Sequence, residues 1–167
     1  MPDLKGNGAD SFSILYQQYA ALVYSIAYSY MRNREDAEDM TEEAFVRLYE
    51  HGTDFPEPAQ AKAWLAAVTR NLCINELKKR NRQKRADELP EDLRSEDSPQ
   101  RTAELNAVME AIGRLPEEYR LPLVLFAVEG YSVRETAEIL SLNESTVRTR
   151  VARAREIIRK ETGVEQT

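Results

Sequence analysis

The sequence predicts an all-α protein built from two small helical domains, and three features of its 167 residues support this class. Apolar residues recur at spacings of three and four, as in amphipathic helices, and no convincing run alternates as a strand does. Glycine and proline are few, at six and seven residues. The apolar periodicity is lost in residues 83–102, where Asp, Glu, Ser and two prolines gather. We therefore expect a flexible acidic linker there, between domains at residues 10–82 and 103–161.

The first domain is expected to begin with two helices. Residues 12–30 form one wide apolar face, with Asp10 or Ser11 as a suitable cap in front of it. Asn33 is suited to cap the next helix, whose apolar stripe lies within residues 37–48. Carboxylates crowd its first turns, where they favour the positive end of the helix dipole.

A loop over residues 52–58 separates the second helix from a third, because its two prolines and its glycine break helical structure. The third helix is expected from about residue 60 to residue 82. Its apolar positions are Trp64, Leu65, Val68, Leu72, Ile74 and Leu77.

The second domain is expected to open with two short amphipathic helices, at residues 105–112 and 121–128, that Leu115-Pro116 separates. Residues 132–160 then predict a helix, a tight turn and a second helix. Ser132 and Glu135 form a capping box, in which side chains satisfy free amides at a helix start. Asn143 is placed to cap the second helix.

That second helix has an apolar side and a cationic side. Val147, Val151, Ala154 and Ile158 face one way, and residues 144–160 contain six Arg or Lys against two Glu, a net charge of +4. A short helix, a turn and a basic helix are the arrangement that seats a recognition helix in the DNA major groove. An ordinary pair of packed helices with a solvated basic surface is the alternative.

The net charge of −6 divides into blocks of opposite sign. Residues 35–57 have a net charge of −8, residues 70–85 of +6, and residues 87–104 of −5. Local fields therefore matter more than the total. One surface suits phosphate, and another suits a basic protein partner.

Little in the sequence supports catalysis or ligand chemistry. Cys73 and His51 are the sole residues of their types, so no disulfide framework, metal cluster or catalytic triad is expected. No nucleophile–base pair or glycine-rich phosphate loop is found, so we expect no catalytic residue, no metal and no cofactor. No signal sequence opens the chain, and no apolar run reaches the roughly 18 residues of a membrane span. We expect a cytoplasmic protein without membrane insertion.

The third helix indicates a second nucleic-acid surface. Its half from Arg70 to Arg80 places amide and cationic groups outward, and the aromatic residues Phe55 and Trp64 lie upstream. Aromatic faces beside positive charge suit single-stranded nucleic acid, because bases stack on rings while cations hold the backbone. The alternative is that both aromatics belong to the core, and for Trp64 in an isolated helix this is the better-supported interpretation.

Together these features resemble the extracytoplasmic-function (ECF) group of bacterial sigma factors, in the sigma-70 family. The similarity covers residues 10–160 and rests on motifs in the family's order. They are the Tyr-rich first helix, Glu35-Asp36-Ala37-Glu38-Asp39-Met40 with Glu43-Ala44-Phe45, Lys62-Ala63-Trp64-Leu65 with Arg70-Asn71, Leu77-Lys78-Lys79-Arg80, Leu115-Pro116-Glu117, and Ser145-Thr146-Val147-Arg148-Thr149-Arg150 with Arg153-Ala154-Arg155.

The resemblance implies a sigma region 2 domain that binds core RNA polymerase and melts the minus-ten element, and a region 4 helix-turn-helix that reads the minus-thirty-five element. It implies polymerase contacts from Asp36, Asp39, Met40, Glu43 and Phe45. It implies minus-ten contacts from Phe55, Trp64, Arg70, Asn71, Lys78, Lys79 and Arg80. It implies minus-thirty-five contacts from Ser145, Thr146, Arg148, Thr149, Arg150 and Arg153.

The partners implied by the resemblance are core RNA polymerase, through its largest-subunit clamp helices and its flap, promoter DNA, and an anti-sigma factor. The chain departs from the family at Glu42, where Gln is common, and at Asn143-Glu144-Ser145, where Pro-x-Gly is common. The loop's Pro56-Glu57-Pro58 leaves the preferred minus-ten base open. Two other functions are compatible with parts of the sequence, namely a stand-alone helix-turn-helix regulator and a helical protein-interaction adaptor.

Overall fold

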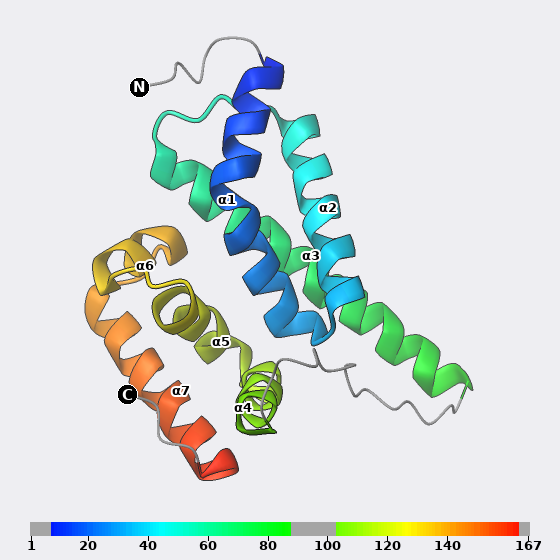
Figure 1. Cartoon of the computed structure of the whole chain (residues 1–167), viewed down its shortest axis with the longest axis vertical. Coiled ribbons are helices and arrows are strands. Elements are labelled where there is room, and N and C mark those ends of the chain that lie inside the picture. Colours follow the sequence, from blue (N-terminus) through cyan, green and yellow to red (C-terminus); the bar gives the residue numbers. More distant parts are fainter. Residues whose placement is uncertain (1–7, 88–102, 164–167) are drawn as a thin grey trace.

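The computed structural model describes residues 8–87 and 103–163, and every regular element within them is a helix (Figure 1). The first domain contains α1 (Gly8–Met31), α2 (Arg34–His51) and α3 (Pro58–Asp87). The second contains α4 (Ala103–Arg114), α5 (Glu117–Leu123), the π-helical turn η1 (Val124–Val128), α6 (Val133–Leu140) and α7 (Glu144–Thr162). The predicted all-α class, with two helical domains, is confirmed.

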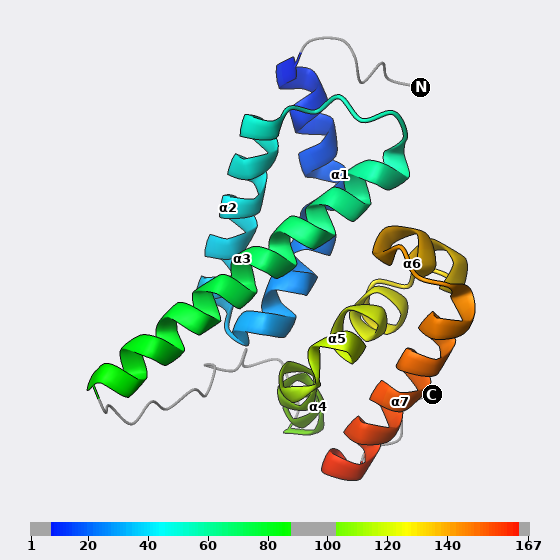
Figure 2. The ribbon, with the colours of Figure 1, turned by 180° about the vertical axis from the view of Figure 1, so that it is seen from behind.

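In the first domain α1 packs against both α2 and α3 (Figure 2). Its core includes Leu22, Ile26, Leu48 and Leu65, each with no more than 1% of its surface exposed. The predicted cap of α1 was wrong. Because α1 already begins at Gly8, Asp10 and Ser11 lie inside its first turns, upstream of the first apolar residue that marked the helix in the sequence.

The predicted cap of α2 is confirmed, since the Asn33 side chain accepts a hydrogen bond from the Asp36 amide at 2.8 Å. The third helix is longer than predicted. It continues beyond Arg82 to Asp87, because no glycine or proline interrupts the chain there. The predicted linker at residues 83–102 is therefore helical at its start, and the rest of it lies outside the described residues.

The helix-turn-helix contains the predicted capping box. The Ser132 hydroxyl accepts from the Glu135 amide at 3.0 Å, and the Glu135 carboxylate accepts from the Ser132 amide at 3.1 Å. Ser141 turns the chain in the left-handed region, with φ 55°. Asn143 occupies the cap position of α7, but its side chain makes no capping hydrogen bond. The predicted inward residues of α7 are all buried: Val147, Val151, Ala154 and Ile158.

The helix predicted over residues 121–128 changes its winding. Pro122 lies inside α5 and has no amide hydrogen to donate. The following residues form the wider η1 turn, in which the Glu129 amide donates to the Val124 carbonyl at 2.9 Å. Val128, the last residue of this turn, is 49% exposed.

The two domains pack against each other, with α6 beside α3, and α4 and η1 beside α1 (Figures 1 and 2). Arg120 of α5 is buried at this junction. Its guanidinium donates to the carbonyls of Ile112, Gly113 and Leu115 at 3.3, 2.6 and 2.9 Å. It also lies 4.4 Å from the centre of the Tyr30 ring on α1. None of the helices in the described ranges is long and apolar enough to cross a membrane.

Candidate nucleic-acid interface

The first half of α7 presents the predicted DNA-reading residues on its outer surface. Ser145, Arg148, Thr149 and Arg153 are exposed, whereas Thr146 and Arg150 are half-buried. The Thr149 hydroxyl donates to the Ser145 carbonyl at 2.9 Å, so it is engaged with the helix backbone. The buried valines on the opposite side fix α7 in the domain, and this leaves Arg148 and Arg153 facing outward. Arg150 instead lines a groove that residues of α3 and α5 also line.

Two of these arginines have carboxylate neighbours on their own helix. Arg148 lies 3.6 Å from Glu144, and Arg153 lies 3.3 Å from Glu156. Their side chains are 62% and 53% exposed. Exposed pairs of this kind contribute at most about 1 kcal/mol, so each arginine can exchange its carboxylate for a phosphate or a base edge at little cost.

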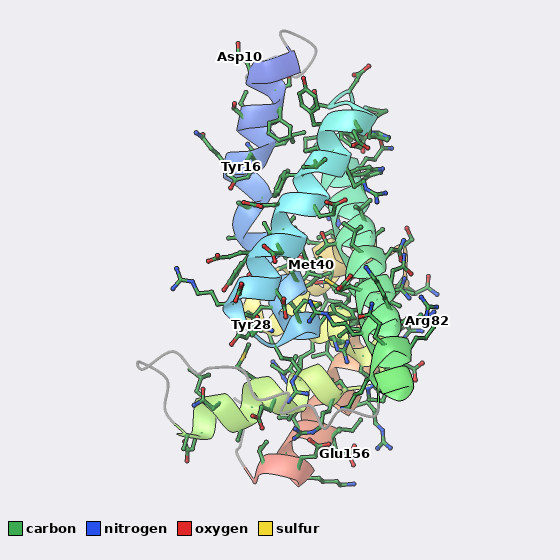
Figure 3. The ribbon with its side chains drawn as sticks, turned by 90° about the vertical axis from the view of Figure 1, so that its right-hand side faces the viewer. Asp10, Tyr16, Tyr28, Met40, Arg82 and Glu156 are labelled. Carbon is green, nitrogen blue, oxygen red and sulfur yellow. The ribbon has the colours of Figure 1, made fainter. Side chains whose placement is uncertain are left out.

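A second polar surface follows the length of α3. Asn71 and Lys78 are exposed, and so are Asn75 and Arg82, which lie between and beyond them at spacings of four, three and four. Lys79 is exposed beside this row. Figure 3 shows Arg82 on the outer side of α3. Asn75 and Arg82 were missing from the predicted site, although the same helical spacing identifies them.

The aromatic residues at the start of α3 form a cluster with a histidine. His51, at the end of α2, stacks on Phe55 with ring centres 5.3 Å apart and planes at 15°. The His51 ring is also 4.6 Å from Trp64, and Phe55 is 6.1 Å from Trp64. Phe55 and Trp64 are half-buried against the core, and His51 is exposed. His51 was missing from the predicted site, although it follows Leu48 by three residues and so continues the buried face of α2.

Phe55 lies in the aromatic cluster, with its ring centre 6.1 Å from that of Trp64. Asn71 lies seven residues beyond Trp64, about 10 Å along α3 at 1.5 Å per residue, and this spacing places both residues on one face of the helix. The Asn71 side chain accepts a hydrogen bond from the neighbouring Arg70 guanidinium at 2.8 Å. The base site that combines Phe55 with Asn71 stays a prediction.

Two predicted site residues bind each other. The Arg80 guanidinium donates to both carboxylate oxygens of Asp36, at 2.8 and 3.0 Å, and joins α3 to α2. These hydrogen bonds hold the pKa of Asp36 below its usual value and raise the pKa of Arg80. The structure thus gives Asp36 and Arg80 a structural role, and neither presents an unpaired charge to a partner.

The outer face of α2 is acidic and partly apolar. Asp39 is exposed, and Glu43 and Met40 are half-buried; Figure 3 labels Met40 on this helix. Phe45, predicted to contact a partner, is only 2% exposed and packs edge-on against Phe12. The exposed apolar residues are instead Val46 at 48% and Tyr49 at 72%, which the sequence analysis did not single out.

Nothing in the described ranges gathers three or more His, Cys, Asp or Glu side chains as a metal site does. Cys73 is buried, and burial raises the pKa of its thiol to about 12. A protonated, buried thiol is a poor nucleophile. The described surfaces offer guanidinium, ammonium and amide groups and aromatic faces.

Comparison with known families assigns both domains. Residues 15–83 match the model of sigma-70 region 2, and residues 105–158 match the model of sigma-70 region 4. The chain is 31% identical to the ECF RNA polymerase sigma factor SigM of Mycobacterium tuberculosis, over 87% of this chain and 74% of that protein. It is 34% identical to the ECF sigma factor SigE of Mycolicibacterium smegmatis, of which it spans 60%. It spans 92% of SigW of Bacillus subtilis, at 27% identity.

Solved structures agree on the fold. The sigma factor RpoE of Bartonella quintana, in complex with the anti-sigma factor NepR, superimposes with a TM-score of 0.73 at 21% identity. The similarity covers 93% of this chain and 99% of that one. CnrH, in complex with the cytosolic domain of CnrY, has a TM-score of 0.61 at 24% identity.

Proposed function

Because the chain belongs to the ECF group of the sigma-70 family, we propose that it binds core RNA polymerase and directs the start of transcription at a particular set of promoters. We assign residues 10–82 to region 2, residues 83–102 to the linker and residues 103–161 to region 4. The observation that carries the proposal is the presence in one chain of two distinct nucleic-acid surfaces, on α3 and on α7.

Region 4 reads the minus-thirty-five element as duplex DNA. The exposed Arg148 and Arg153 on α7 supply the guanidinium groups that bind guanine edges or phosphates. Ser145 and Thr149 add hydroxyl groups at the start of the same helix. Glu144 is the group that opposes this binding, because its carboxylate repels phosphate and pairs with Arg148.

Region 2 captures the minus-ten element and holds its separated strand. The polar row on α3 tracks the DNA backbone through Lys78, Lys79 and Arg82, while Asn71 offers an amide to a base edge. The cluster of His51, Phe55 and Trp64 offers aromatic surface to an unstacked base. Extruding a base costs a few kcal/mol, and stacking on aromatic rings offsets that cost.

The outer face of α2 meets the polymerase. Asp39 and Glu43 supply negative charge, and Val46 and Tyr49 supply the apolar contact area that a stable protein interface needs. By family resemblance the contact is with the clamp helices of the largest subunit, and region 4 contacts the flap. Phe45 supports this face from within the core, because it packs against Phe12, whose ring also contacts Tyr49.

We further propose that an anti-sigma factor controls this chain, since RpoE was solved in complex with the anti-sigma factor NepR. Sigma factors are not enzymes, and the binding chemistry of the two surfaces is consistent with a purely directing role in the cytoplasm.

A measurement of promoter binding, with and without core polymerase, distinguishes a sigma factor from a stand-alone regulator. We expect specific promoter binding only with core polymerase, whereas a regulator binds its operator unaided, usually as a dimer on two half-sites.

A further inference from the structure

Three contacts restrict the orientation of the His51 ring at the end of α2. The ring stacks on Phe55, with centres 5.3 Å apart, and its centre lies 4.6 Å from that of Trp64. The His51 Nδ1 atom lies 2.9 Å from the Gly52 carbonyl oxygen, within hydrogen-bond distance. Two ring contacts and one hydrogen bond therefore hold the imidazole in one position beside the aromatic surface of region 2.

The contact with Gly52 identifies which ring nitrogen of His51 is protonated. A carbonyl oxygen only accepts hydrogen bonds, so Nδ1 must carry the hydrogen that it donates. At neutral pH an imidazole is mostly uncharged and carries a single ring hydrogen, so the Nε2 atom is left with a lone pair. His51 is exposed, and Nε2 has no hydrogen-bond partner among the residues that the structure describes. A hydrogen-bond acceptor is therefore available at the surface of the aromatic cluster.

We propose that His51 selects the base that region 2 extrudes from the minus-ten element, by accepting at Nε2 a hydrogen bond from the amino group of cytosine or adenine. This inference rests on the proposed function of the cluster of His51, Phe55 and Trp64 as a site for an unstacked base. Cytosine and adenine carry a donating amino group where thymine and guanine carry an accepting carbonyl oxygen. A carbonyl oxygen would face the Nε2 lone pair without a hydrogen between them. The site therefore prefers amino bases to keto bases.

The hydrogen bond supplies selectivity that the rings of the cluster cannot supply. Every base has a π-face, so stacking on Phe55 or Trp64 tolerates all four bases. A directional acceptor distinguishes an amino group from a carbonyl oxygen. Because His51 is exposed, water competes for Nε2, and the preference should be about three- to tenfold, as for one hydrogen bond of ordinary net strength.

Selection from a pool of templates measures this preference with the complete polymerase complex. A promoter found by run-off transcription is prepared with an unpaired minus-ten region, and its non-template strand carries cytosine or uracil at random at each unpaired position. These two bases differ at the amino and carbonyl groups but have the same ring size. Sequencing of the templates that the complex retains gives the ratio of cytosine to uracil at each position. A second pool with adenine or hypoxanthine tests the purines in the same way.

We expect one position at which the amino base is enriched about three- to tenfold in at least one pool. His51→Phe keeps an aromatic ring but removes both nitrogens, so the ratio at that position should fall to about one. Glu50→Gln is the matched control, because Glu50 is an exposed neighbour on the same helix, and it should keep the wild-type ratio. A preference that survived in His51→Phe would overturn the proposal.

Nuclear magnetic resonance tests the protonation of the ring without DNA. His51 is the one histidine in the sequence, so nitrogen-15 labelling of histidine gives an unambiguous signal from each ring nitrogen. A neutral histidine side chain in water favours the hydrogen on Nε2. We expect the opposite form here, with the hydrogen on Nδ1, at about pH 8, where imidazole is largely neutral. A hydrogen on Nε2 would contradict the proposed acceptor.

The selection also separates this inference from the proposed function. If the polymerase complex retained templates but showed no preference for an amino base at any position in either pool, only the role of His51 would be overturned. If the chain and core polymerase together retained no promoter template, the proposed function would fail, and the role of His51 with it.

Discussion

Asp36 on α2 and Arg80 on α3 form a bidentate ion pair that joins the two helices of the region 2 domain. The two oxygen–nitrogen distances are 2.8 and 3.0 Å. The Asn33 side chain donates to the same carboxylate at 2.6 Å, and Glu76 accepts from Arg80 at 3.1 Å. The cap of α2 is thus fastened to α3 through a connected set of hydrogen bonds.

Asp36→Asn should destabilise the fold by about 1–2 kcal/mol, the usual size for lost hydrogen bonds to a partly buried charge. Urea unfolding measures the change. Asp39→Asn, on the exposed face of the same helix, is the control and should stay within about 0.5 kcal/mol.

The same pair predicts a pH dependence. Because Arg80 holds the pKa of Asp36 below its unfolded value, the stabilisation is complete above the ordinary carboxyl pKa and is lost as the pH falls through the lower folded value. Asp36→Asn should therefore lose less stability than the wild type on acidification below about pH 4. If the free energy of unfolding fell equally in both proteins on acidification, the Asp36–Arg80 ion pair would contribute nothing to stability.

Arg148→Ala and Arg153→Ala should each weaken binding of the polymerase complex to the minus-thirty-five element. A bidentate base contact is worth roughly 1–3 kcal/mol and relaxes sequence preference at one position, whereas a phosphate contact mainly lowers the salt slope. Titration of promoter binding at several salt concentrations distinguishes these roles.

Glu144→Gln is the informative partner variant. It removes the carboxylate 3.6 Å from Arg148, so it should strengthen promoter binding where the arginine variants weaken it. If all three substitutions left binding unchanged, α7 would not be the recognition helix.

Asp39→Lys combined with Glu43→Lys should abolish co-purification with core polymerase and leave helical content intact. Asp39 is exposed, and Glu43 is half-buried and pairs with Arg47 on the same helix. The neutral pair Asp39→Asn and Glu43→Gln is the matched control and should retain part of the binding through Val46 and Tyr49. If the lysine variant still co-purified normally with core polymerase, Asp39 and Glu43 would not belong to the polymerase interface.

Phe55→Ala and Asn71→Ala should spare polymerase assembly and upstream DNA binding but reduce strand opening. Phe55 packs on Trp64, and Asn71 lies about 10 Å beyond Trp64 along α3, so the double variant should lose at least as much opening as either single variant. Permanganate footprinting of open complexes measures the opening. A template with an unpaired minus-ten region should recover part of the lost transcription, and normal opening by the double variant would remove both residues from the site.

Local sequence signals predicted the local structure well, and the structure shows why. The Ser132–Glu135 capping box and the Asn33 cap depend on neighbours three residues apart, and the apolar side of α7 depends on spacing alone. Such features need no knowledge of the rest of the chain. Fold class and helix positions followed from them.

Features that depend on distant contacts were not predictable. Arginine is usually a surface residue, so the sequence did not indicate that Arg120 is buried. Only the fold brings its guanidinium to three backbone carbonyl groups and to the ring of Tyr30. Asp36 and Arg80 looked like members of two different interfaces until α2 and α3 were placed side by side. Phe45 belongs both to the apolar stripe and to the family motif, and only the fold shows that it is buried. No pattern in the sequence predicts the ion pair between Arg70 and Glu117, because it joins helices of different domains.

Run-off transcription with purified core RNA polymerase and a genomic promoter library tests the central claim most directly. The proposed function predicts discrete transcripts that appear only when this chain is added, and that share a minus-thirty-five and a minus-ten element upstream of their starts. The Asp39→Lys, Glu43→Lys variant should give none. Transcripts that are the same with and without the chain, or specific DNA binding by the chain in the absence of polymerase, would contradict it.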